Sequence, residues 1–136
     1  MENNRSTFQR AFTHLYFLML SADKIADLKE LKIGNKIMSL ENLDKAVVMK
    51  DMDLLSSLPR EKVFDEGVNI LKTLSKEEQL KTLGYLKLIA KVDGSYDEKE
   101  SDLLNEISLN NLQISLQEIA EIEVVLKKAI SEINDQ

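Results

Sequence analysis

The chain has 136 residues, a net charge of −6 and no cysteine. This length suits a single domain whose core needs no disulfide or metal for stability, and the missing cysteines exclude thiol catalysis and thiolate metal ligands. The acidic balance argues against binding to nucleic acid, which requires clustered Lys and Arg. It suits cations or basic partner surfaces instead.

Apolar residues recur at helical spacing from Phe8 to Ala22 and cover nearly all sides of the predicted helix. Such a helix belongs at the centre of a bundle. Its uncharged run, Ala11 to Ala22, is shorter than the roughly 20 residues that cross a bilayer. We therefore expect no transmembrane segment and a cytoplasmic protein. His14, the only histidine, should be packed inside the bundle rather than catalytic.

Three shorter helices are expected next. Asp27 and Glu30 have the spacing of a capping box, in which each residue satisfies a backbone N–H of the other, and they predict the start of the second helix. A third helix with less certain ends should run from Glu41 to about Leu55. Pro59 suits the first turn of a fourth helix, where a missing N–H is tolerated.

The second half of the chain repeats these signals around another long apolar run, Leu80 to Val92. The capping spacing opens three helices here, at Ser75 and Glu78, Asp97 and Glu100, and Ser115 and Glu118. With no strand pattern and no long linker, the sequence predicts an all-α fold. We expect one domain over residues 1–136, a compact bundle of about seven helices.

An acidic pattern occurs twice, each time just after a long apolar segment. In each copy an Asp is followed by a second Asp four positions later and by a Glu seven positions later. The first copy consists of Asp23, Asp27 and Glu30, and the second consists of Asp93, Asp97 and Glu100. Repetition at a fixed offset indicates a duplicated unit, so we expect two pseudo-repeated halves.

Two roles stay open for these six carboxylates. As helix caps they would accept hydrogen bonds from the unpaired N–H groups of the following helix, and this is the reading we favour. As metal ligands they would form an oxygen-only set, which suits Ca²⁺, Mg²⁺ or Mn²⁺. The second copy is not an EF-hand, because Glu98 occupies the position of the required Gly and Leu104 that of the bidentate Glu.

The run from Ala90 to Gly94, followed by Glu100, resembles the signature of the TerB-like family with one extra residue. Ala22-Asp23 with Glu30 repeats it, with Lys24 in place of the glycine. This family is named for bacterial tellurite resistance and includes the N-terminal domain of DjlA-type co-chaperones. The resemblance implies a helical fold with pseudo-twofold halves, an acidic patch and a non-enzymatic, stress-associated role near the inner membrane.

No acid, base and nucleophile set emerges, so we expect no enzyme. The leading interpretation is an interaction module that presents an acidic surface to a protein partner, at the inner-membrane surface if the family pattern holds. The alternative is a divalent-cation-binding module that uses the repeated acidic turns. No cofactor is certain beyond such a cation. Whether the protein forms a homo-oligomer stays open.

Overall fold

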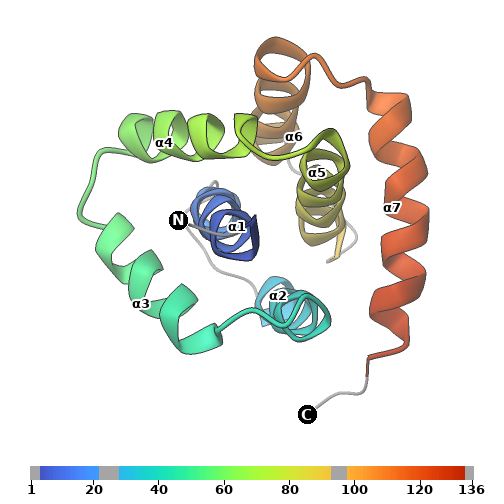
Figure 1. The fold of residues 1–136 in the computed structure, drawn as a ribbon, viewed down its shortest axis with the longest axis horizontal. Coiled ribbons are helices and arrows are strands. Elements are labelled where there is room, and N and C mark those ends of the chain that lie inside the picture. The colour runs from blue at the N-terminus through green and yellow to red at the C-terminus, as the bar shows by residue number, and fades with distance from the viewer. Residues whose placement is uncertain (1–3, 22–27, 93–97, 134–136) are drawn as a thin grey trace.

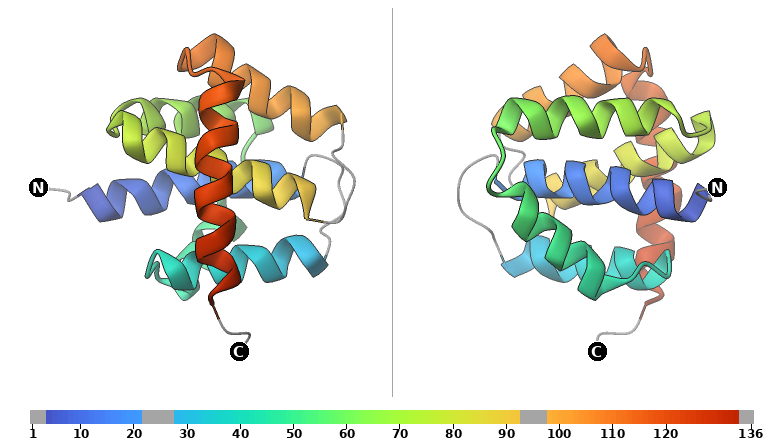
Figure 2. Two further views of the ribbon diagram at one scale, coloured as in Figure 1. Left: turned by 90° about the vertical axis from the view of Figure 1, so that its right-hand side faces the viewer. Right: turned by 60° about the vertical axis from the view of Figure 1, so that its left-hand side comes forward.

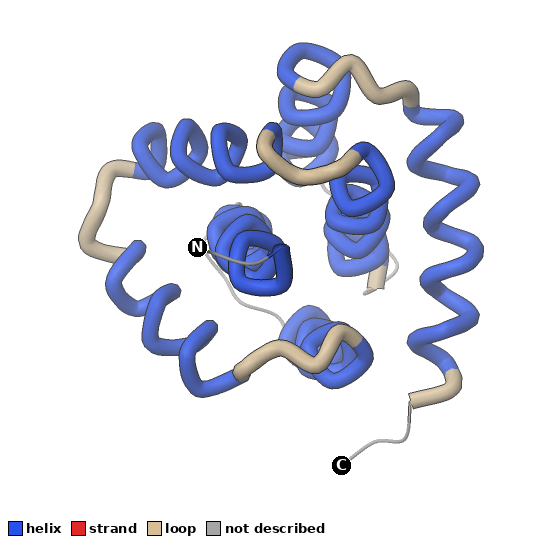
Figure 3. The backbone as a smooth tube through the Cα atoms, in the orientation of Figure 1, coloured by secondary structure: helices blue, strands red, loops and turns tan. Residues whose placement is uncertain are grey.

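The computed structural model describes residues 4–21, 28–92 and 98–133, and the regular structure in these ranges is entirely helical (Figures 1 and 3). This confirms the expected all-α bundle. A π-helical turn, η1 (Glu106–Asn111), continues the sixth helix. The helices are α1 (Asn4–Leu20), α2 (Leu28–Leu40), α3 (Lys45–Leu55), α4 (Arg60–Lys72), α5 (Lys76–Lys91), α6 (Glu98–Asn105) and α7 (Leu116–Ser131).

The two long apolar segments form the central helices α1 and α5, as predicted. In Figure 1 both are seen nearly end on, with the other helices arranged around them. The side chains of α1 fill the core on almost every side, and Phe8, Phe12 and Leu15 are all inaccessible to solvent. Within the described residues, no helix has the length and apolar character needed to cross a membrane.

The packing reflects the predicted division into two halves. The most extensive helix contacts join α1 to α4 and α5 to α7, so the central helix of each half packs against the last helix of that half. The halves differ between these helices. The first contains α3, which packs on α1, whereas the second contains the π-helical turn η1.

In η1 the backbone hydrogen bonds join residues five positions apart, instead of four as in an α-helix. The Leu112 N–H donates to the Ile107 carbonyl, five residues earlier, at 3.1 Å. The Ser108 side chain is fully buried here, and its hydroxyl has no hydrogen-bond partner in the described part of the chain. A buried polar group of this kind lowers local stability.

The third helix starts later than the sequence predicted, at Lys45 rather than Glu41. The reason is the end of α2, where Asn42 takes a left-handed conformation with φ of 58°. Leu43 N–H then donates to the Met38 carbonyl at 2.8 Å, which makes the Schellman motif that ends a helix. Asp44 caps α3 instead, accepting a hydrogen bond from Val47 N–H at 3.1 Å.

The other predicted caps form to different degrees. Ser115 and Glu118 make a full capping box at the start of α7. At α5 the Ser75 hydroxyl accepts from Glu78 N–H at 3.2 Å, but the reciprocal bond to the Ser75 backbone is not formed. Pro59 precedes α4 as its N-cap residue, one position before the predicted first-turn site.

Gly34 allows α1 and α2 to approach closely. A Cβ atom at this position would lie 2.0 Å from the Oη atom and 2.3 Å from the Cζ atom of Tyr16, whose side chain is almost fully buried. The tyrosine ring therefore occupies space that any other residue at position 34 would need. Because the ring is rigid and enclosed, it has little room to move aside.

We expect Gly34→Ala to destabilise the protein by about 1–3 kcal/mol, because overpacking of the Tyr16 ring outweighs the better helix propensity of alanine. Asn35→Ala, at an exposed position of the same helix, is the matched control and should change stability little. Urea unfolding of both variants measures the difference. Unchanged or increased stability of Gly34→Ala would show that the Tyr16 ring can move aside to make room for the added methyl group.

Candidate functional site

The predicted acidic site lies mostly outside the described residues. Asp23, Asp27, Asp93 and Asp97 fall in the segments that the structure does not describe, and Glu100 belongs to α6 with its side chain also outside the description. Both following helices begin where the pattern predicted, α2 at Leu28 and α6 at Glu98. The roles of the six carboxylates as caps or metal ligands therefore stay predictions.

The helix ends that flank the two acidic segments lie together. Both views of Figure 2 show the last turns of α1 and α5 and the first turns of α2 and α6 at the same end of the molecule. The two acidic segments, residues 22–27 and 93–97, are covalently joined to these ends. The fold thus brings the boundaries of both copies to one end of the bundle, although they are far apart in sequence.

Glu30 is the one predicted site residue whose side chain is described, and it is buried, with 4% of its surface exposed. Its backbone carbonyl accepts a hydrogen bond from the Tyr16 hydroxyl at 3.2 Å. Burial raises the pKa of Tyr16, and the nearby negative charge of Glu30 raises it further. Glu30 is thus part of the core at the start of α2. It does not form part of an exposed acidic surface.

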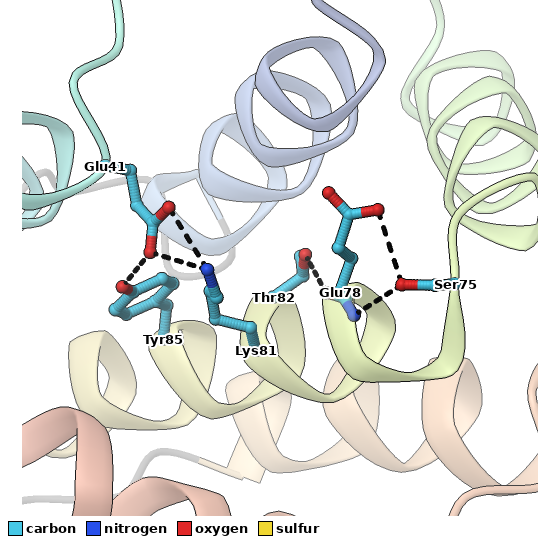
Figure 4. A network of polar contacts seen from close by, with 6 residues as sticks. All are labelled: Glu41, Ser75, Glu78, Lys81, Thr82 and Tyr85. Atoms are coloured by element: carbon cyan, nitrogen blue, oxygen red, sulfur yellow. Dashed lines mark hydrogen bonds and ion pairs between the residues drawn. The ribbon is translucent and has the colours of Figure 1, made fainter. Parts of the chain in front are cut away.

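A second buried carboxylate, Glu41, was missed as a site by sequence reasoning. It lies just after the end of α2, is 7% exposed, and accepts a short hydrogen bond from the Tyr85 hydroxyl of α5 (Figure 4). The Lys81 ammonium lies 3.2 Å from the same carboxylate. Lys81 also lies over the ring of Phe8, at 5.7 Å from its centroid, which favours a cation.

The sequence contains a signal for this network. An Asn two residues beyond a helix often ends it in the left-handed conformation, and Asn42 followed by the cap Asp44 marks a helix end and a new start. These two residues place Glu41 in the turn between two helices, whereas the sequence prediction made it the first residue of the third helix. Its partners on α5, Lys81 and Tyr85, are 40 and 44 positions away, and no local pattern identifies them.

His14 is packed between α1 and α4, as expected. Its Nδ1 atom lies 2.9 Å from the Arg10 carbonyl and its Nε2 atom 3.3 Å from the Glu66 carboxylate. Across the described ranges, no group of three or more His, Asp or Glu side chains is arranged to hold a metal ion. That search does not reach the two acidic segments.

We expect Glu41→Gln to destabilise the protein by about 1.5–3 kcal/mol, because it removes the charge that Tyr85 and Lys81 both contact. Glu121→Gln, which neutralises an exposed carboxylate on α7, is the control and should be close to neutral. The free energy of unfolding in urea is the measurement. Equal effects of the two substitutions would contradict a structural role for the Glu41 network.

Tyr16 should make the protein sensitive to alkaline pH. Its pKa is raised above the ordinary value of 10.0 in the folded state, so the unfolded chain loses this proton first. The stabilisation is therefore present below pH 10 and lost as pH rises toward the folded pKa, by up to about 1.4 kcal/mol per pH unit. In Tyr16→Phe the fall of unfolding free energy between pH 9.5 and 11.5 should be shallower. An identical slope in both proteins would refute the assignment.

No protein-family model, curated protein or solved structure matches this chain. The similarity to the TerB-like family consequently rests on the sequence motif alone, and it stays a prediction. Function has to be argued from the charges and contacts of the molecule itself.

Proposed function

We propose that the protein is a non-catalytic, TerB-like interaction module that binds a basic protein surface through its acidic end. The acidic end is defined here as the segments 23–30 and 93–100, which contain both copies of the pattern. One observation supports the proposal above all: the helix ends that flank these segments lie at the same end of the bundle. A stress-associated role near the inner membrane accompanies the proposed family membership.

The two segments should contribute unequally. Segment 93–100 has four carboxylates and one lysine, whereas segment 23–30 has three carboxylates and two lysines. In the first segment Glu30 is also buried, which removes its carboxylate from a partner's reach. Attraction to a basic partner is then expected to depend mainly on the second segment, because its net charge is −3 and that of the first segment is −1.

The alternative function is divalent-cation binding, and the repetition of the same carboxylate spacing favours it. Two segments joined to one end of the bundle could supply oxygen ligands from both copies to a single ion. Ca²⁺ accepts six to eight such ligands in flexible geometry. This reading requires both segments, whereas the interaction module depends chiefly on the second.

A pair of charge-neutralised variants tests the proposal. Asp93→Asn with Asp97→Asn should weaken binding of a decalysine peptide at low ionic strength by about three- to tenfold, the loss expected when two ion pairs are removed. Asp53→Asn with Asp65→Asn removes the same charge from exposed positions on α3 and α4 and is the matched control. Equal loss in both variants would mean that the peptide senses only net charge, and the proposal would fail.

Titration with Ca²⁺, Mg²⁺ and Mn²⁺ separates the alternative. Saturable changes at micromolar metal, confined to amides of residues 23–30 and 93–100, or the matching paramagnetic broadening by Mn²⁺, would establish cation binding. The double variant Asp27→Asn with Asp97→Asn should then abolish this cation binding. Spectra unchanged at millimolar metal would exclude the cation site and leave the interaction module standing.

A further inference from the structure

A small pocket lies where α2, α5 and α7 meet, the three helices at the right of Figure 1. Its volume is about 260 Å³, which is slightly smaller than most pockets for drug-sized ligands. Apolar side chains from all three helices form most of its wall, and charged groups lie among them. The lining residues are Ile33, Leu88, Lys91, Val92, Glu123, Lys127 and Ile130.

Among the described residues, one carboxylate lines this pocket, and neighbouring lysines neutralise it. Glu123 has a side chain that is 12% exposed, and its carboxylate lies 3.0 Å from the Lys91 ammonium and 3.6 Å from that of Lys87. Two lysines therefore lie against one largely enclosed glutamate, and their two positive charges exceed its single negative charge. An anion approaching the pocket would meet this excess of positive charge.

Lys127 is a second lysine that lines the pocket, after Lys91. Its side chain is exposed, and it forms no ion pair with any residue in the described part of the chain. A local excess of positive charge thus borders an apolar pocket in a protein whose net charge is −6.

We propose that this pocket binds a small anionic amphiphile, namely a monomeric medium-chain alkyl carboxylate. The alkyl chain would replace water over Ile33, Leu88 and Ile130, and the carboxylate would lie between Lys91 and Lys127. Apolar contact provides most of the affinity of such a ligand, while the few polar groups orient it. The inference does not depend on the acidic end, because the charge that it uses has the opposite sign.

Two properties of the pocket favour a single chain over a protein surface. A stable protein interface buries roughly 1,200–2,000 Å² in total, whereas this pocket is small and bounded by three helices. A neutral alkyl group would leave Lys127 without a counter-ion, and a cationic amphiphile would be repelled by Lys91 and Lys127. An alkyl carboxylate matches both the apolar wall and the charge.

The test uses the full chain and decanoate below its micelle concentration, followed by amide shifts and calorimetry. We expect saturable binding with shifts centred on residues 86–92 and 123–130, and roughly tenfold weaker binding of octanoate. Lys127→Gln should weaken decanoate binding by about two- to fivefold, as for one exposed ion pair, and Lys127→Glu should weaken it more. Lys50→Gln, an exposed lysine on α3, should bind as the wild type does.

Comparison ligands make the result decisive. Decanol should bind more weakly than decanoate, and decyltrimethylammonium should bind least. The proposal is overturned if decanol and decanoate bind alike, if Lys50→Gln matches Lys127→Gln, or if no saturable shift appears. Binding to phosphatidylglycerol vesicles without binding of monomeric decanoate would also overturn it, in favour of a lipid surface. Failure of the decalysine experiment leaves these outcomes unaffected.

Discussion

The placement of α2 is the constraint on which the rest of the structure depends. This helix belongs to the first half of the chain, yet it packs against α5 and α7 of the second half. Its first turn is held to α1 by the Tyr16 hydroxyl, and its end is held to α5 by the contacts of Glu41 with Tyr85 and Lys81. Apolar packing alone is not directional, so these polar contacts fix where the helix lies along its own axis. Both the acidic end and the lysine-bordered pocket rely on that placement.

Local chemistry explains which parts of the fold the sequence could predict. Long apolar runs identified the two central helices, and Ser115 with Glu118 marked the start of α7 through a bond that spans only three residues. The start of α3 was placed four residues too early, because the turn through the left-handed Asn42 occupies the residues between α2 and α3. The Glu41 network and the three-helix pocket join residues that are far apart in the sequence, and periodicity contains no information on such pairings. Of the predicted acidic site, the helix boundaries are confirmed and the burial of Glu30 was unexpected.

Charge is distributed unevenly over this acidic protein. Segment 93–100 has the highest density of carboxylates adjoining a helix end, while the lysines of α5 and α7 lie beside the apolar pocket. The two regions are adjacent in sequence, because Val92 lines the pocket and Asp93 begins the acidic pattern. If both proposals hold, one small domain attracts a cationic partner at one place and an anionic ligand at another. Salt should weaken the attraction of an anion to Lys127, because that side chain is exposed.

The π-helical turn η1 has a consequence for how the length of this chain can vary. Its hydrogen bonds span five residues where an α-helix spans four, so the turn contains one residue more than regular helix would need. Removing a residue here would restore α-helical register between α6 and Leu112 and would take away a stretch in which the Ser108 hydroxyl is buried without a partner among the described residues. Deletions elsewhere in the core helices would rotate every following side chain by about 100°. Related chains of different length should therefore differ by a single residue at this point, while the spacing within α1 and α5 stays constant.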